Sequence, residues 1–132
     1  MKTERLMRLE LPYVITLALL VVHEIDSAFW HEWDLFGLPG GIQLFLAANL
    51  ALLLPFLYGL VRLSRSPRAG APFSVALACA GLAAFGIHTY FLLRGRPEFR
   101  LPASLAVLGV TLATSLWLLI VSVRTLRSGP HR

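Results

Sequence analysis

Two His-Glu-x-Asp tetrapeptides hold most of the residues in this chain that could do chemistry. His23-Glu24-Ile25-Asp26 is followed eight residues later by His31-Glu32-Trp33-Asp34, at the end of the first hydrophobic segment. Ionisable groups are costly inside a membrane, so their concentration at this place predicts a functional site. Neither tetrapeptide is the His-Glu-x-x-His motif of zinc proteases, because Ser27 and Leu35 stand where the second histidine is required.

The first tetrapeptide has a spacing that suits a metal ion. His23 and Asp26 are three residues apart and share one face of a helix. With His88, from a later segment, they form a two-histidine, one-carboxylate set with open positions, which suits zinc or non-haem iron. Glu24 lies about 100° around the helix and is predicted to be a catalytic acid or base. Glu32 would lie on the opposite side of a continuous helix, and we expect the second tetrapeptide to be solvated in the membrane interface.

Three further residues are predicted to contact substrate or to orient a metal ligand: Asn49, Thr111 and Trp30. At a rise of ~1.5 Å per residue, His23 lies about 18 Å into the membrane and His88 about 24 Å. Asn49 falls at about 19 Å, and Thr111 at a similar level. Polar groups at one level on four helices predict a shared site.

Each of these polar residues also has a purely structural interpretation. His88 could hydrogen-bond a neighbouring helix, and His23 with Asp26 could be a buried pair without a metal. Asn49 could bridge two helices. Haem between His23 and His88 is geometrically feasible, but no other feature of the sequence favours it.

Long apolar segments must position this site. The chain has 132 residues, of which 57% are hydrophobic, and its mean hydropathy is +0.72. Residues 11–30, 42–61, 72–93 and 101–123 are each near the ~20 residues that a helix needs to cross a bilayer. They lack the alternation of membrane β-strands. We predict a single all-α integral membrane domain over residues 1–132, a four-helix transmembrane bundle in contact with the lipid bilayer.

The basic residues lie in the gaps between the apolar segments. Nine of the twelve fall on the side of the termini, and Arg94, Arg96 and Arg100 fall on the other side. This asymmetry predicts that both termini are cytoplasmic. The same distribution does not form a phosphate-binding face, so we expect no nucleic-acid partner. We also expect a polar loop at residues 65–70 and an aromatic belt that includes Phe99.

At these positions the chain resembles a family of uncharacterised bacterial membrane proteins named for a His-x-x-Glu-Glu motif, which is paired with a downstream Asn-x-x-x-His. His23 and His88 match the two histidines, and Asp26 takes the place of the first glutamate. Ser27 and Ala84 replace the second glutamate and the asparagine. The resemblance implies a small multi-span protein of unsettled activity, so it supports the site without naming a reaction.

Two classes of function are consistent with the sequence. The first is a metal-dependent hydrolase or isomerase acting on a lipid-like substrate, with a divalent metal ion (zinc or iron) on His23, Asp26 and His88. The alternative is a non-enzymatic membrane subunit or transport component, whose buried polar residues fix helix packing or relay protons. The metal content of the purified protein separates the two classes. A homo-oligomer is compatible with either.

Overall fold

The computed structural model describes residues 2–128, with side chains from residue 9 onward. Its helices are α1 (Lys2–Phe29), α2 (Glu32–Leu35), α3 (Gly41–Arg65), α4 (Pro67–Leu93) and α5 (Pro102–Arg127). All but α2 are long and apolar enough to cross a membrane. Residues 2–128 contain no strand. The prediction of an all-α protein with four membrane-spanning helices is therefore confirmed.

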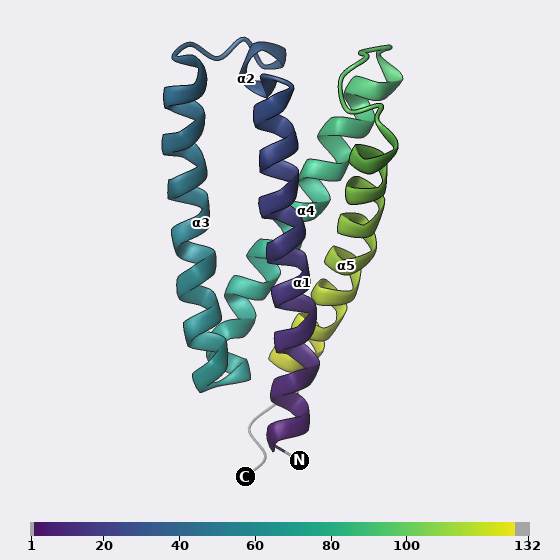
Figure 1. The fold of residues 1–132 in the computed structure, drawn as a ribbon. Coiled ribbons are helices and arrows are strands. Elements are labelled where there is room, and N and C mark those ends of the chain that lie inside the picture. The colour runs from purple at the N-terminus through teal and green to yellow at the C-terminus, as the bar shows by residue number, and fades with distance from the viewer. Residues whose placement is uncertain (1, 129–132) are drawn as a thin grey trace.

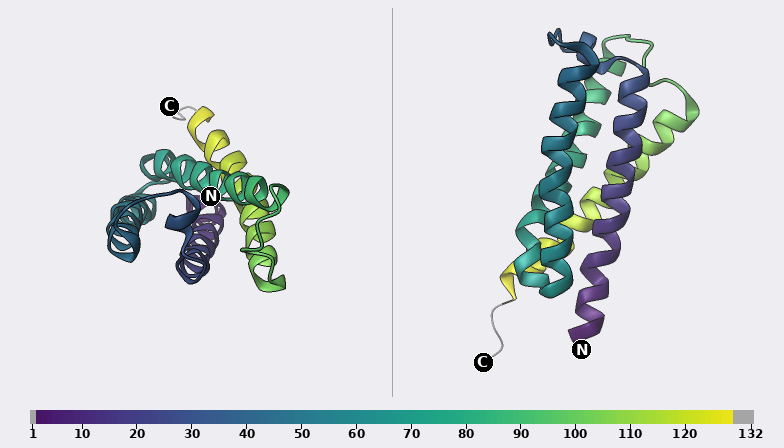
Figure 2. Two further views of the ribbon diagram at one scale, coloured as in Figure 1. Left: turned by 90° about the horizontal axis from the view of Figure 1, so that it is seen from above. Right: turned by 60° about the vertical axis from the view of Figure 1, so that its left-hand side comes forward.

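The four long helices form two layers (Figures 1 and 2). α1 lies between α3 and α5, and α4 crosses behind them and contacts all three. Within the described part of the chain, α3 and α5 do not contact each other. The beginning of α1 and the end of α5 lie at one end of the bundle (Figure 1). α2 and the connection between α4 and α5 lie at the opposite end, which is called the distal end below.

α3 and α4 are joined by a single residue, Ser66, so the prediction of a polar loop over residues 65–70 is wrong. Ser66 has an extended backbone, and its Oγ accepts a hydrogen bond from the backbone N–H of Ala69 at 3.4 Å. Pro67 then occupies the first helical position, where its missing N–H and fixed φ cost nothing. The serine cap and the proline thus start α4 five residues before the apolar segment begins.

α3 packs most closely against α1 and α4 in its second half, away from the distal end. Tyr13 Oη on α1 donates a hydrogen bond of 2.6 Å to the backbone carbonyl of Phe56 on α3. Gly70 on α4 lies against α3 so closely that a Cβ at this position would lie 2.5 Å from the Cα of Leu63. The buried residues of α3 are Phe56, Gly59 and Leu63, all in its second half. The first half of α3, toward the distal end, therefore packs less closely against the other helices.

Candidate metal centre

The two predicted histidine ligands meet at the distal end of the bundle. His23 on α1 and His88 on α4 are buried, with 2% and 1% of their surface exposed. Their ring centroids are 4.4 Å apart and the rings are perpendicular. Sequence spacing alone thus placed these two side chains on helix faces that do meet.

One hydrogen bond of His88 determines which ring nitrogen is available to bind a metal. His88 Nδ1 lies 2.8 Å from the backbone carbonyl oxygen of Ala84, one helical turn earlier. A carbonyl only accepts, so Nδ1 carries the proton and donates it, and the neutral ring presents an unprotonated Nε2. Metal-binding histidines are commonly oriented in this way. The acceptor is a backbone carbonyl oxygen, so the alanine at position 84 does not prevent the interaction.

Glu32 supplies the carboxylate beside these histidines. Its Oε1 is 3.6 Å from His88 Nε2, and its side chain is only 12% exposed. The donor atoms of His23, Glu32 and His88 all lie within 4.8 Å of one another, so the group could hold a metal ion. Asp26 is not a member of this group, although the sequence placed it there.

A chain reversal brings Glu32 to this position. α1 ends at Phe29, and His31 adopts a left-handed backbone with φ 52° and ψ 52°. The single turn of α2 then begins at Glu32. In a continuous helix Glu32 would point about 180° away from His23, as the sequence analysis assumed. The left-handed residue breaks that periodicity, so Glu32 is largely buried and the expectation that it is solvated is wrong.

The other two ionisable residues of the second tetrapeptide are solvated, as expected. The side chains of His31 and Asp34 are 66% and 71% exposed, and His31 Nδ1 lies 4.0 Å from Asp34 Oδ2. The His31 ring stacks on Trp33, with ring centroids 5.0 Å apart. The second tetrapeptide therefore contributes one of its three ionisable side chains to the centre.

The dimensions of the group fit a metal ion. In a tetrahedral zinc site with bonds of about 2.0–2.1 Å, neighbouring ligand atoms are about 3.4 Å apart. The 3.6 Å between Glu32 and His88 is close to this value, and the other separations, which are within 4.8 Å, must shorten by up to about 1.4 Å. Among the described residues, His23 Nδ1 and His88 Nε2 have no hydrogen-bond partner. An unpaired buried polar atom costs about 1–3 kcal/mol, which coordination to a metal would offset.

Phe99 covers the histidine pair from the connection between α4 and α5. It is fully buried, and its ring lies edge-on to His88 with centroids 4.2 Å apart. Its backbone φ is +66°, a left-handed conformation that is uncommon for a bulky residue and costs about 1–2 kcal/mol. The expectation that Phe99 belongs to an exposed aromatic belt is wrong, because this backbone turns the ring inward. No sequence signal distinguishes it from the neighbouring aromatic residues.

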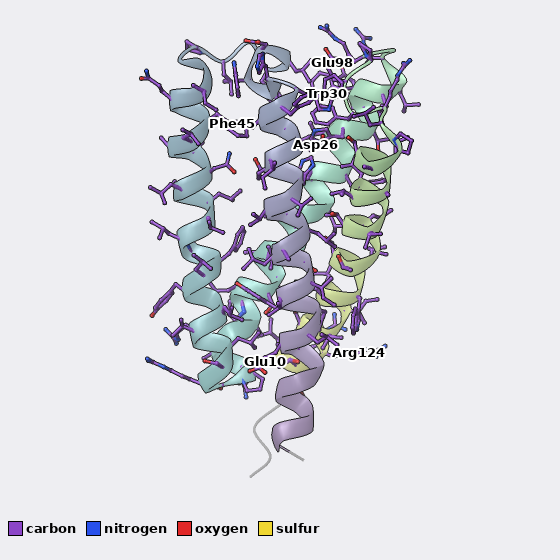
Figure 3. All side chains as sticks on the ribbon, viewed as in Figure 1. Glu10, Asp26, Trp30, Phe45, Glu98 and Arg124 are labelled. Carbon is purple, nitrogen blue, oxygen red and sulfur yellow. The ribbon has the colours of Figure 1, made fainter. Side chains whose placement is uncertain are left out.

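Other residues predicted for the site lie around it and not within it. Asp26 and Trp30 are partly buried at the distal end, near Glu98 (Figure 3). Asp26 Oδ2 and Trp30 Nε1 have no hydrogen-bond partner within residues 9–128. Trp30 approaches Phe99, with ring centroids 6.3 Å apart. Asp26 and Trp30 therefore neighbour the residues that cover the centre.

Glu24, Asn49 and Thr111 lie outside the group of possible metal ligands. Glu24 and Asn49 face a groove between α1 and α3. The side-chain Nδ2 of Asn49 donates to the backbone carbonyl of Phe45, on its own helix, at 3.1 Å. Thr111 is fully buried on α5, where it approaches Gly81 of α4. Of the four helices predicted to share a polar site, only α1 and α4 contribute to the histidine group.

Comparison with known proteins gives the family. Residues 9–125 match a family described as Family of unknown function (DUF6713). The chain belongs to that family. No curated protein and no solved structure matches the chain.

The DUF6713 match contains the whole candidate centre. His23, Glu32, His88 and Phe99 all fall between residues 9 and 125. The family description names neither a motif nor an organism. The resemblance to the His-x-x-Glu-Glu proteins and the bacterial origin therefore stay predictions for this member of DUF6713.

Proposed function

We propose that the protein binds a divalent transition metal, zinc or iron, through His23, Glu32 and His88, and hydrolyses or isomerises a lipid-like substrate there. The observation that carries this proposal is a pair of buried imidazole nitrogens, unpaired among the described residues, beside a carboxylate. Two histidines and one carboxylate form the ligand set of known catalytic zinc and non-haem iron sites. A metal held by three protein ligands keeps a position for water or substrate and acts as a Lewis acid.

The surrounding residues suit this use. The Ala84 carbonyl fixes the orientation and tautomer of His88, so that its Nε2 can act as a ligand. The Phe99 ring covers His88 and restricts the access of water. Glu24 and Glu32 line one hollow beside Asn49, which leaves Glu24 as the proton-accepting or proton-donating group next to the centre. Glu32 thus replaces Asp26 in the proposed ligand set.

We also propose that this is an integral protein of the bacterial inner membrane with both termini in the cytoplasm. The nine basic residues near the termini and at the turn between α3 and α4 contrast with three at the distal end. Positive charge is enriched on the cytoplasmic side of membrane proteins. In this orientation the metal centre lies in the outer half of the membrane.

Metal analysis of the purified protein tests the proposal. We expect about one zinc or iron ion per chain, loss of the ion in His88→Ala, and retention in His31→Asn. His31 is the matched control because its ring is exposed, and asparagine tolerates the left-handed backbone of this position. Circular dichroism checks that each variant keeps its helices. A wild-type protein that folds without metal, after growth with both metals, would overturn the proposal.

A metal-free relay is the second candidate function. The 3.6 Å contact between His88 and Glu32 is a histidine–carboxylate pair inside the bundle, of the kind that passes protons in transporters. In that case the protein is a non-enzymatic membrane subunit or transport component. Folded metal-free protein with proton flux in liposomes that Glu32→Gln abolishes would favour this function.

A further inference from the structure

A groove separates α1 from α3 toward the distal end. It has a volume of 350 Å³, within the range of roughly 300–1,000 Å³ that small-molecule sites occupy. Phe45 on α3 projects toward α1 at this level (Figure 3). Apart from two polar residues, the walls are apolar, with side chains that include Leu20, Ile25, Leu46, Leu50 and Leu53. These walls suit a hydrocarbon chain.

The two polar residues of this groove are Glu24 and Asn49. An acid among leucines inside a membrane segment is costly, so its presence points to a polar ligand group. Asn49 uses its Nδ2 to donate to the carbonyl of Phe45, which leaves its side-chain oxygen as an acceptor. The groove therefore offers acceptors at one place along an apolar wall.

The groove leads toward the candidate metal centre. A second hollow of 190 Å³ is lined by Glu24 and Asn49, which it shares with the groove, and also by Glu32 and Trp33. Glu32 is the carboxylate 3.6 Å from His88. A molecule whose chain lies in the groove can thus bring its polar end to Glu32, the carboxylate beside His88.

We infer that this groove binds a single-chain neutral lipid with a hydroxyl-bearing headgroup, such as a monoacylglycerol. Acceptor atoms on Glu24 and Asn49 select a headgroup that donates hydrogen bonds. An anionic headgroup such as that of a fatty acid would place a second carboxyl group beside Glu24 among apolar walls, where charge is costly. A hydroxyl is also cheaper to transfer into an apolar groove than an ammonium group. The inference names the substrate class of the proposed function. Only the reaction of the bound lipid depends on that function; the binding of the lipid does not.

Photocrosslinking tests the inference. The probe is a monoacylglycerol with a diazirine in its acyl chain, added to the full-length protein in phosphatidylcholine nanodiscs. We expect crosslinks on residues 20–28 of α1 and 45–56 of α3, which contribute the walls of the groove. Unlabelled 1-oleoylglycerol should reduce them about tenfold, whereas oleate at the same concentration should not. Labels spread equally over the lipid-facing side of α5 indicate annular lipid only and overturn the inference.

Paired tryptophan variants locate the site. Leu50→Trp fills the groove and should reduce crosslinking about tenfold. Leu116→Trp is the matched control, because this leucine is also exposed but lies on α5, outside the groove. Glu24→Leu should keep the crosslinks but remove the preference for 1-oleoylglycerol over oleate. Undiminished crosslinking of Leu50→Trp contradicts the assignment.

Metal measured in the same samples separates this inference from the proposed function. If His88→Ala loses its metal but keeps groove crosslinks, both stand. A metal-free wild-type protein with competable groove crosslinks leaves lipid binding intact and overturns the metal proposal. Bound metal without groove crosslinks supports the metal proposal and overturns lipid binding in the groove.

Discussion

Replacing Glu32 by glutamine tests which carboxylate completes the metal centre. The change removes one negative charge and keeps the shape of a side chain whose Oε1 lies 3.6 Å from His88 Nε2. Structural zinc sites hold the ion by about 10–16 kcal/mol through four ligands, or roughly 2.5–4 kcal/mol per ligand. At about 1.4 kcal/mol per factor of ten, losing the carboxylate should raise the metal Kd by about 10²–10³.

A chelator-competition titration of the detergent-solubilised protein measures this Kd, and circular dichroism monitors folding. Asp34→Asn is the matched control, because it removes the same charge from the same helix at a side chain that is 71% exposed. Exposed charges contribute about 0–1 kcal/mol, so its Kd should change by about fivefold at most. Asp26→Asn should also have a small effect, because Asp26 is outside the ligand group. If Asp26→Asn raises the Kd about a hundredfold while Glu32→Gln does not, Asp26 is the carboxylate ligand and the assignment of Glu32 is wrong.

Three further outcomes are expected. A cysteine replacing Leu38 should react with an impermeant thiol reagent in intact cells while one replacing Thr3 should not; the opposite labelling pattern would put the termini outside. Gly81→Leu should destabilise the protein by about 1–3 kcal/mol in thermal unfolding, because even a Cβ at this position overlaps Ser115 Oγ. Gly86→Leu has open space around it and should not destabilise the protein; equal losses would contradict the packing of α4 on α5. Metal retention in equilibrium dialysis should fall as the pH drops from about 7 to about 5, because protons compete for imidazole nitrogens, and pH-independent retention would argue against histidine ligands.

The sequence was sufficient for the helices and for two of the three members of the centre. Uninterrupted apolar segments of membrane-spanning length are expected to form α-helices, because a helix satisfies its own backbone hydrogen bonds in lipid. His23 and His88 were recognisable because imidazoles at similar depth in two such segments are rare and costly. Their helix faces followed from the 3.6-residue period alone.

The rest of the centre depends on backbone geometry outside the regular helices. Glu32 enters the group because His31 adopts a left-handed conformation, and Phe99 covers it because its own φ is positive. Such conformations are uncommon for residues other than glycine, so the positive φ of His31 and Phe99 could not be predicted from the sequence. Asp26 was preferred because it is three residues from His23 on the same helix face. Glu32 was discounted because helical periodicity was extended past Phe29, where α1 ends.

The order of the residues along the chain has a consequence for biogenesis. His23 lies on the first membrane helix to be synthesised and Glu32 follows directly after it, but His88 lies near the end of α4. A nascent chain that has inserted only α1 and α3 therefore holds two members of the group and lacks the third. Metal loading of the proposed centre would therefore be a late step of assembly, completed only after α4 has inserted and packed against α1.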